Sequence, residues 1–209
     1  HGNTLRENVD LMRDLQALGA EPSALAGTVI LDSTAGMTET EAFQRGDFYI
    51  QDMAAKLAAM VSDAQPGMTV LDSCAAPGGK TIAAAMLMEN KGKIISCDIH
   101  EKKLRLIREN TSRLGIDIVE TRAMDARRPH EDLKDRFDLI IADVPCSGLG
   151  VIRRRPEIRR KSKAELDNLP SIQLEILEGL APCLKAGGTL VYSTCTVRSK
   201  ENELLVRAF

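Results

Sequence analysis

The pattern of hydrophobic and polar residues changes at about residue 68. Beyond it, short continuous apolar runs alternate with longer amphipathic segments. Continuous apolar runs predict strands that are buried on both faces. The candidate strands are Thr69–Leu71, Lys93–Cys97, Ile118–Arg122, Phe137–Ala142 and Thr189–Tyr192. The intervening segments predict helices at Lys80–Glu89, Glu101–Leu114 and Ser171–Leu184, the last with a kink at Pro182. This alternation predicts an α/β fold whose mostly parallel sheet carries helices on both faces.

The pattern of hydrophobic and polar positions is less regular before residue 68. Thr4 and Glu7 have the spacing of a capping box and introduce a predicted helix over residues 3 to about 18. Glycines interrupt the short runs between residues 19 and 47, and a second helix is predicted over Gln51–Val61. We therefore expect a small α+β subdomain over residues 1–50, followed by a larger domain over residues 51–209.

Polar loops directly follow several of the predicted strands. Asp72, Asp98 and Asp143 each stand just after an apolar run, and Ser193-Thr194-Cys195 follows the last one. Because parallel strands end at the same edge of a sheet and ligands bind outside that edge, residues scattered along the chain are expected to share one site. A second cysteine, Cys146, lies in the loop after Asp143.

The first of these loops has features of a nucleotide-binding turn. Pro77-Gly78-Gly79-Lys80 leads from a strand into a helix, where paired glycines and free N–H groups can approach a ligand. The spacing differs from G-x-G-x-x-G, and Cys74 stands where a P-loop requires glycine. Asp98 is placed to bind a ribose, or to cap the next helix, and Asp125 to bind the amine of adenine. Taken together, these residues favour nucleoside binding.

The composition narrows the class of protein. The 209 residues carry a net charge of −2, with 3% aromatics and no Trp, so attraction to nucleic acid requires a local basic patch and not stacked aromatics. Five cysteines without a C-x-x-C pair argue against a disulfide framework and a zinc site, and favour a reducing cytoplasm. No signal peptide or membrane-length apolar run is visible. We expect a cytoplasmic monomer that holds no metal and binds no membrane.

A basic run follows the Cys146 loop. It consists of Arg153, Arg154, Arg155, Arg159 and Arg160, with Lys161 and Lys163 nearby. Charge runs are most often solvated surface. This one adjoins the expected site in an otherwise acidic chain, so we expect it to contact phosphates, with binding that weakens steeply with salt. The chain begins at His1 and stops at Phe209 within a predicted helix, and we expect it to be a fragment of a longer protein.

Three loops resemble motifs of the NOL1/NOP2/Sun RNA cytosine-5 methyltransferases. They are Asp72-Ser73-Cys74-Ala75-Ala76-Pro77-Gly78-Gly79-Lys80, Asp143-Val144-Pro145-Cys146-Ser147-Gly148 and Ser193-Thr194-Cys195-Thr196. Phe48-Tyr49-Ile50-Gln51-Asp52 resembles the segment that precedes that catalytic domain. Gly150-Val151-Ile152-Arg153-Arg154 resembles the bacterial Sun-type branch, which methylates 16S ribosomal RNA. The likeness runs from about Asn3 to the end of the chain.

The resemblance implies a Rossmann-like, S-adenosylmethionine-dependent methyltransferase domain in residues 51–209 and an RNA-recognition-like subdomain in residues 1–50. It also implies that a final antiparallel hairpin follows Phe209, and that RNA is the partner. The family nucleophile corresponds to Cys195, and Cys146 corresponds to a helper in product release. Cofactor contacts are implied for Cys74, Ala75, Ala76, Pro77, Gly78, Gly79, Lys80, Asp98, Asp125 and Asp143.

Cytosine C5 is a poor nucleophile, which explains why such chemistry needs a thiol. Addition of a thiolate to C6 makes C5 electron-rich, so one difficult step is divided into easier ones. A Pro-Cys loop holds the nucleophile in DNA cytosine-5 methyltransferases, which would point to Cys146, but the RNA family moves the role to Cys195. Lys80 is a source of positive potential that favours thiolate. Asp143, if protonated, can donate to N3, and Lys80 can orient it.

Other functions fit these residues less well. A methyltransferase of proteins or small molecules has no use for two cysteines at strand ends. A nicotinamide dehydrogenase does not fit the glycine spacing. A non-catalytic RNA-binding factor in ribosome assembly, built on a methyltransferase fold, remains the alternative.

Overall fold

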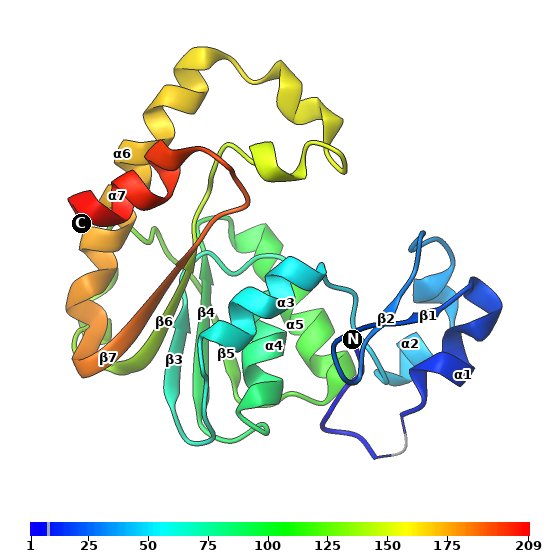
Figure 1. Cartoon of the computed structure of the whole chain (residues 1–209). Helices are drawn as coiled ribbons and strands as arrows, with labels where there is room; N and C mark the ends of the chain where they lie inside the picture. Colours follow the sequence, from blue (N-terminus) through cyan, green and yellow to red (C-terminus); the bar gives the residue numbers. More distant parts are fainter. Residues whose placement is uncertain (8) are drawn as a thin grey trace.

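A computed structural model describes residues 1–7 and 9–209. At its centre lies a five-stranded sheet in which every neighbouring pair of strands is parallel (Figure 1). The strands are β3 (Thr69–Asp72), β4 (Lys93–Asp98), β5 (Val119–Ala123), β6 (Phe137–Asp143) and β7 (Leu184–Ser193), in the spatial order β5-β4-β3-β6-β7. The predicted α/β sheet is confirmed. β7 begins at Leu184 instead of Thr189, because its first residues pair irregularly with the start of β6.

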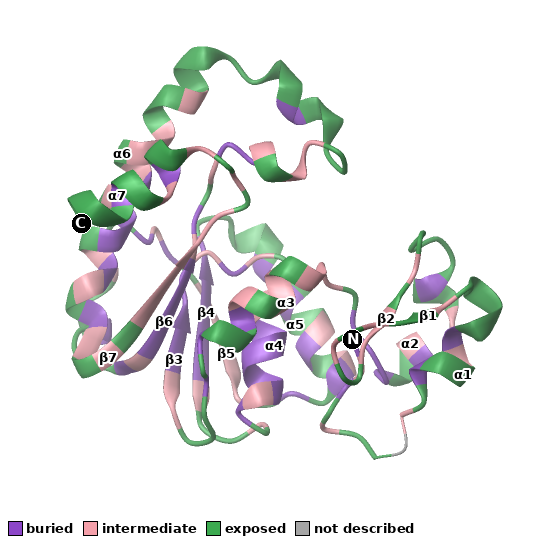
Figure 2. Cartoon of the chain, in the orientation of Figure 1, coloured by how far each residue is buried: buried purple, intermediate pink, exposed green. Residues whose placement is uncertain are grey.

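Helices cover both faces of the sheet because side chains alternate between the faces along each strand. Val70 and Ile94 pack in one buried cluster with α4, whereas Leu71 and Ile95, the next residues in the same strands, pack in another with α6 and α7. The helices are α3 (Met53–Val61), α4 (Gly79–Leu87) and α5 (Glu101–Leu114) on one side, and α6 (Lys163–Leu180) and α7 (Glu203–Ala208) on the other. Buried residues concentrate on the three central strands, β3, β4 and β6, and on the helix surfaces that face the sheet, whereas the edge strands β5 and β7 have none (Figure 2).

The predicted helix over Ser171–Leu184 is wrong at both ends. α6 begins at Lys163, where Ser162 and Glu165 form a capping box, and it ends at Leu180. The first turns of α6 are largely exposed and polar, so the apolar pattern marks only its second half. Pro182 lies in the 3-10 turn η6 (Ala181–Cys183), so it follows the helix and does not kink it.

The predicted N-terminal helix is also wrong in its extent. Residue 8 lies outside the described residues, and only Leu11–Leu15 forms a helix, α1, which continues as the 3-10 turn η1 (Gln16–Leu18). The Asp10 side chain caps α1, so the Thr4–Glu7 spacing does not begin a helix. The N-terminal unit, residues 1–50, also contains β1 (Glu21–Pro22) paired antiparallel with β2 (Val29–Ile30), the 3-10 turn η2 (Met37–Glu39) and α2 (Glu41–Arg45).

Polar contacts fasten this N-terminal unit to the end of α5. The Asn3 amide donates to the carbonyls of Gly46 and Leu114, at 2.8 Å each. The Arg113 guanidinium donates to the carbonyls of Phe43 and Phe48, at 2.7 and 3.0 Å. Gly46 has a φ of +81°, and a Cβ at this position would overlap the Arg113 carbonyl. The unit therefore has a defined orientation against the sheet domain.

The strand order places a switch point between β3 and β6. From β3 the chain moves outwards to β4 and β5, and then returns to β6 and β7 on the other side. The connection from β6 to α6 contains the 3-10 turns η4 (Leu149–Val151) and η5 (Pro156–Arg160) and lies beyond the carboxyl ends of the strands (Figure 1). This edge is where ligands bind in open α/β sheets.

Candidate active site

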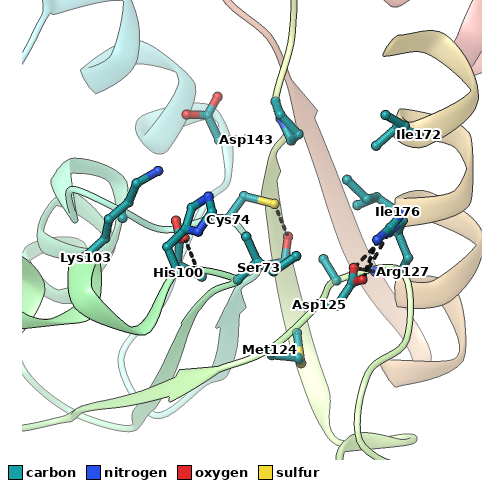
Figure 3. A pocket seen from close by; sticks show the side chains of 15 residues that line it. Ser73, Cys74, His100, Lys103, Met124, Asp125, Arg127, Asp143, Ile172 and Ile176 are labelled. Atoms are coloured by element: carbon teal, nitrogen blue, oxygen red, sulfur yellow. Dashed lines mark hydrogen bonds and ion pairs between the residues drawn. The ribbon is translucent and has the colours of Figure 1, made fainter. Parts of the chain in front are cut away.

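A cavity of about 410 Å³ opens at this edge of the sheet. Its walls come from the ends of β3, β4, β5 and β6 and from α6 (Figure 3). Five predicted site residues line the cavity: Cys74, Ala76, Asp98, Asp125 and Asp143. The structure thus brings together side chains that stand far apart in the sequence, as the strand-end pattern predicts.

Asp98 is the buried acid of this cavity. One of its carboxylate oxygens accepts a hydrogen bond from the His100 backbone N–H at 2.8 Å. Its other oxygen accepts no hydrogen bond from the part of the chain that the structure describes, and Asp98 lines the cavity. His100 is the N-cap residue of α5, and no side chain caps this helix. Asp98 is therefore not a helix cap, and its second oxygen can accept a hydrogen bond from a ligand hydroxyl.

Asp125 is already engaged by a neighbour. The Arg127 guanidinium donates to both of its oxygens, at 2.7 to 3.1 Å, and lowers the pKa of that carboxyl (Figure 3). Arg127 also lies 3.7 Å from Glu175 on α6. A ligand amine at Asp125 therefore has to share the carboxylate with Arg127.

The glycine turn, residues 77–80, packs closely against α5 and the Gln51 side chain. Ala75, Pro77, Gly78 and Gly79 do not line the cavity. A Cβ at Gly78, whose φ is +106°, would crowd Ile107 of α5, and a Cβ at Gly79 would crowd the Gln51 side chain. The two glycines are therefore required by the close approach of this turn to α5 and to residue 51.

Asp72 lies fully buried beneath this turn. The hydroxyl of Thr81, in the first turns of α4, donates to its carboxylate at 2.7 Å and also bonds Ser96 at 2.9 Å. Burial raises the pKa of Asp72 to about 7. The acid thus anchors the beginning of α4, which carries Lys80.

Lys80 and Asp143 form an ion pair between the glycine turn and the Cys146 loop. The Lys80 Nζ lies 2.6 Å from one Asp143 oxygen, and the Lys80 side chain is only 12% exposed. The Ser193 hydroxyl donates to the other Asp143 oxygen. Since Asp143 also lines the cavity, it connects the cavity to the cysteine loops.

The two cysteine loops meet at their sulfur atoms. The Sγ atoms of Cys146 and Cys195 lie 3.2 Å apart, although 49 residues separate them in the sequence. Cys195 is exposed and Cys146 is half-buried, and neither is in a disulfide. The Cys195 side chain therefore faces solvent at the strand-end edge and not the hydrophobic interior.

The contact between the two sulfur atoms shifts the pKa values of Cys146 and Cys195 in opposite directions. A hydrogen bond from Cys146 lowers the pKa of Cys195 to about 6, helped by the positive charge of Lys80 and opposed by burial and Asp143. The same bond raises the pKa of Cys146 well above the usual range. The Cys195 N–H donates to the Cys146 Sγ at 3.3 Å, which acts in the opposite sense but is weaker. The contact therefore favours the thiolate on Cys195 and the proton on Cys146.

The remaining cysteines differ from this pair. Cys97 and Cys183 are buried in the core, and Cys74 lies in the first loop with a pKa that burial raises to about 12. Within residues 1–7 and 9–209, no cluster of three His, Cys, Asp or Glu side chains could hold a metal ion. No helix in the same residues is long and apolar enough to cross a membrane.

The basic run lies on η5 and the turns around it. Arg153, Arg155, Arg159 and Arg160 are exposed, and no acidic side chain among the described residues pairs with them. Arg154 instead pairs with Asp52 at the beginning of α3. Lys161 donates to the carbonyls of Cys146 and Ser147, at 3.3 and 3.1 Å, so it supports the cysteine loop.

Ten residues that line the cavity were not among the predicted site residues. They are Ser73, Ile99, His100, Lys103, Met124, Ala126, Arg127, Pro145, Ile172 and Ile176. Ile99 could have been found from the sequence, because it is an apolar residue directly after the strand-end acid Asp98. It is 56% exposed in the structure. Ile172 and Ile176 of α6 could not have been found, because apolar residues four positions apart are typical of any helix that packs on a core.

Comparisons with known proteins point to one family. The family model for 16S rRNA methyltransferase RsmB/F matches residues 59–209. A probable ribosomal RNA small subunit methyltransferase B of Bacillus subtilis (strain 168) is 47% identical over 172 residues, which cover 81% of this chain and 38% of that protein. A similarly named protein of Synechocystis is 35% identical over 209 residues, covering 96% and 46%.

Solved structures show the same relationship. The crystal structure of PH0851 has a TM-score of 0.92 at 34% identity and covers 100% of this chain and 48% of its own. NSun6 from Pyrococcus horikoshii with SFG has a TM-score of 0.72 at 36% identity, covering 82% and 44%. The chain thus spans half or less of the length of these relatives. Its sheet is the Rossmann-like sheet of S-adenosylmethionine-dependent methyltransferases. The chain belongs to the RsmB/F family of 16S rRNA methyltransferases.

Proposed function

We propose that this protein methylates C5 of a cytosine in RNA, with 16S ribosomal RNA as substrate and S-adenosylmethionine as methyl donor. The observation that carries the proposal is the thiol pair at the strand-end edge, with an exposed Cys195 of lowered pKa 3.2 Å from Cys146. The named relatives are ribosomal RNA small subunit methyltransferases, which supports RNA as the substrate class.

The cavity residues fit S-adenosylmethionine. Asp98 offers its second carboxylate oxygen to ribose hydroxyls, and Ile99, Ile172 and Ile176 offer apolar surface to a base. NSun6 from Pyrococcus horikoshii was solved with SFG, an analogue of this cofactor. When bound, S-adenosylmethionine supplies the electrophilic methyl group. The predicted contacts at Cys74, Ala76, Asp98, Asp125, Asp143 and the glycine turn remain part of this proposal.

Cys195 acts as the nucleophile in this mechanism. Its thiolate forms a bond to C6 of the cytosine, and the displaced electron pair makes C5 nucleophilic while charge develops towards N3. The Lys80–Asp143 pair stands at the junction of the cavity and the thiols, so it is positioned to stabilise that charge. Asp143 accepts from Lys80 and Ser193 in the described geometry. It can donate to N3 only after it takes up a proton.

Cys146 assists when the adduct resolves. After C5 has accepted the methyl group, solvent water takes the C5 proton and the C5–H electron pair re-forms the double bond to C6. The bond from C6 to sulfur breaks at the same time, which returns a negative charge to the Cys195 sulfur. The Cys146 thiol, 3.2 Å away, donates a hydrogen bond to that sulfur and so stabilises the leaving thiolate. Without this donor, cleavage slows and the RNA–protein adduct lasts longer.

RNA contact is assigned to the basic run and to the N-terminal unit. The exposed guanidiniums of Arg153, Arg155, Arg159 and Arg160 extend from the Cys146 loop and are free to meet phosphates. Arg154 can do so only by leaving Asp52. Residues 1–50 provide the RNA-recognition-like subdomain, and the target base must leave its stack to reach Cys195. We place this activity in the cytoplasm, in a monomer.

Trapping with RNA that contains 5-fluorocytosine tests the proposal. Fluorine replaces the C5 proton that must leave, so wild-type protein with S-adenosylmethionine should form a stable adduct that migrates slowly on a denaturing gel. Cys195→Ala should form none. Cys146→Ala should accumulate adduct even on ordinary RNA, and Cys183→Ala, a change at a core thiol distant from the strand-end edge, should behave as wild type.

Two results would overturn the assignment. Adduct formation that survives Cys195→Ala and disappears in Cys146→Ala would reverse the roles of the thiols. RNA binding without any adduct or methyl transfer would favour the alternative of a non-catalytic factor in ribosome assembly.

A further inference from the structure

The turn after the Cys195 loop contains a buried acid that the proposed chemistry does not use. Glu201, at the end of the 3-10 turn η7 (Ser199–Glu201), is 0% exposed. Its Oε2 accepts from the Ser147 backbone N–H at 2.8 Å and from the Gln173 amide at 3.0 Å, and its Oε1 accepts from Arg198 at 3.3 Å. Burial of a carboxylate is costly unless donors surround it. Here the donors include the residue directly after Cys146.

Two neighbours extend this contact along both loops. Gln173, buried on α6, donates its amide to the Pro145 carbonyl at 3.0 Å as well as to Glu201, so both sides of Cys146 are tied to one pair of side chains. The Tyr192 hydroxyl, at the end of β7, donates to the Glu201 backbone carbonyl at 2.6 Å. The Cys146 loop is thereby attached to the strand that leads into Cys195.

Asn202, the next residue, holds the Cys195 loop. Its Oδ1 accepts from the Thr194 hydroxyl at 2.6 Å, and its Nδ2 donates to the Thr196 carbonyl at 3.0 Å. These two threonines flank Cys195. The Ser147 and Thr196 hydroxyls bond to each other at 2.6 Å and join the two loops directly.

We propose that Glu201 and Asn202 are positioning residues that together set the approach of the Cys146 and Cys195 sulfur atoms. Glu201 acts through Ser147, and Asn202 acts through Thr194 and Thr196. Neither thiol loop has regular structure at the cysteine, so side-chain hydrogen bonds from one turn fix both. The catalytic meaning of this inference rests on the proposed function, but the placement of the thiols does not.

The pH dependence of Cys195 alkylation tests the inference without RNA. Iodoacetamide labelling is measured against pH in the folded chain, and Cys195 is quantified by peptide mass spectrometry. Glu201→Gln keeps the shape but places an N–H₂ group where two donors already converge. Asn202→Asp keeps the acceptor for Thr194 and loses the donor to Thr196. Each should raise the labelling midpoint by about one pH unit, a tenfold change in the ionisation constant, and slow adduct formation about tenfold or more.

Glu203→Gln is the matched control, because this glutamate is exposed on α7 beside the same turn, and its midpoint should equal that of wild type. Loss of thermal stability in Glu201→Gln and Asn202→Asp with an unchanged midpoint would show that the network only holds the fold, and would overturn the inference. If Glu201→Gln does not fold, the labelling midpoint of Asn202→Asp alone tests the inference, and an unchanged midpoint would overturn it. A shifted midpoint in a protein that forms no RNA adduct would support the inference and refute the proposed function.

Discussion

The acidity of Cys195 depends on its contact with Cys146, so removal of the Cys146 thiol should raise the pKa of Cys195. The hydrogen bond from Cys146 is the largest of the effects that lower the pKa of Cys195 to about 6, from its usual value of 9.0. Burial and Asp143 oppose that bond, and Lys80 assists it. In Cys146→Ala the donor is lost, so the pKa of Cys195 should rise by at least about two units, back towards the range of a free thiol.

The consequence at neutral pH is large. A lowered pKa keeps more of Cys195 as thiolate at pH 7, whereas a free thiol with a pKa of about 8.5 is only about 3% thiolate. The labelling rate at one pH understates this change, because a thiolate of higher pKa is intrinsically more nucleophilic, with a Brønsted slope of about 0.4–0.5. The midpoint of the full pH profile is therefore the quantity to measure.

The assay is alkylation of Cys195 from about pH 5 to pH 10, a range that brackets the free-thiol pKa, with site-resolved mass spectrometry. Wild-type labelling should rise through pH 6 and level off by about pH 7, because only the deprotonated form reacts. Cys146→Ser is the matched control, since its hydroxyl can still donate to the Cys195 sulfur, and its midpoint should stay low. A midpoint near 6 in Cys146→Ala would refute the reasoning and leave Lys80 as the source of the acidity.

Three further predictions concern the cofactor, the fold and the thiols. Asp98→Asn should weaken S-adenosylmethionine binding tenfold to a hundredfold by calorimetry, because a hydrogen bond to a charged acceptor contributes about 1.5–3 kcal/mol; unchanged affinity would remove Asp98 from the site. Gly46→Ala should destabilise the chain by about 2 kcal/mol or more in urea, since its Cβ would overlap the Arg113 carbonyl at a positive φ; a tolerated change would mean that the N-terminal unit is not held closely against α5. Diamide should oxidise Cys146 and Cys195 to a disulfide as each thiol loses one hydrogen to the reagent, because their sulfur atoms are already 3.2 Å apart. Non-reducing peptide mapping should detect the link and dithiothreitol should reverse it, whereas its absence would contradict the described contact.

The sheet and the main site residues could be predicted from the sequence because their signals are local. A strand buried on both faces has a continuous apolar run, as in β3 and β6, and five candidate strands with helices between them leave few alternatives to a parallel sheet. The carboxyl ends of such strands share one edge, so Asp98, Asp143 and Cys195 could be assigned to one site from their positions alone. The motif resemblance then pointed to the family that the comparisons show.

Other features were hidden because they depend on partners distant in sequence. The exposed first half of α6 has no apolar pattern, so only the Ser162–Glu165 cap marks its beginning. Asp125 reads as a free acid, but Arg127 folds back onto it. The glycines after Pro77 read as space for a ligand, whereas Ile107 and Gln51 occupy the positions that their side chains would need.

The sequence by itself determined the strands, the faces that they bury and the set of reactive groups at one edge, since apolar periodicity and strand direction follow from covalent order. Only the tertiary structure decided the chemical state of those groups. The acidity of Cys195, the pairing of Asp143 with Lys80 and the burial of Glu201 beneath both thiol loops are set by distances of about 3 Å between residues dozens of positions apart. Hydrogen bonds and ionisation respond to such distances, and no local pattern of residues records them.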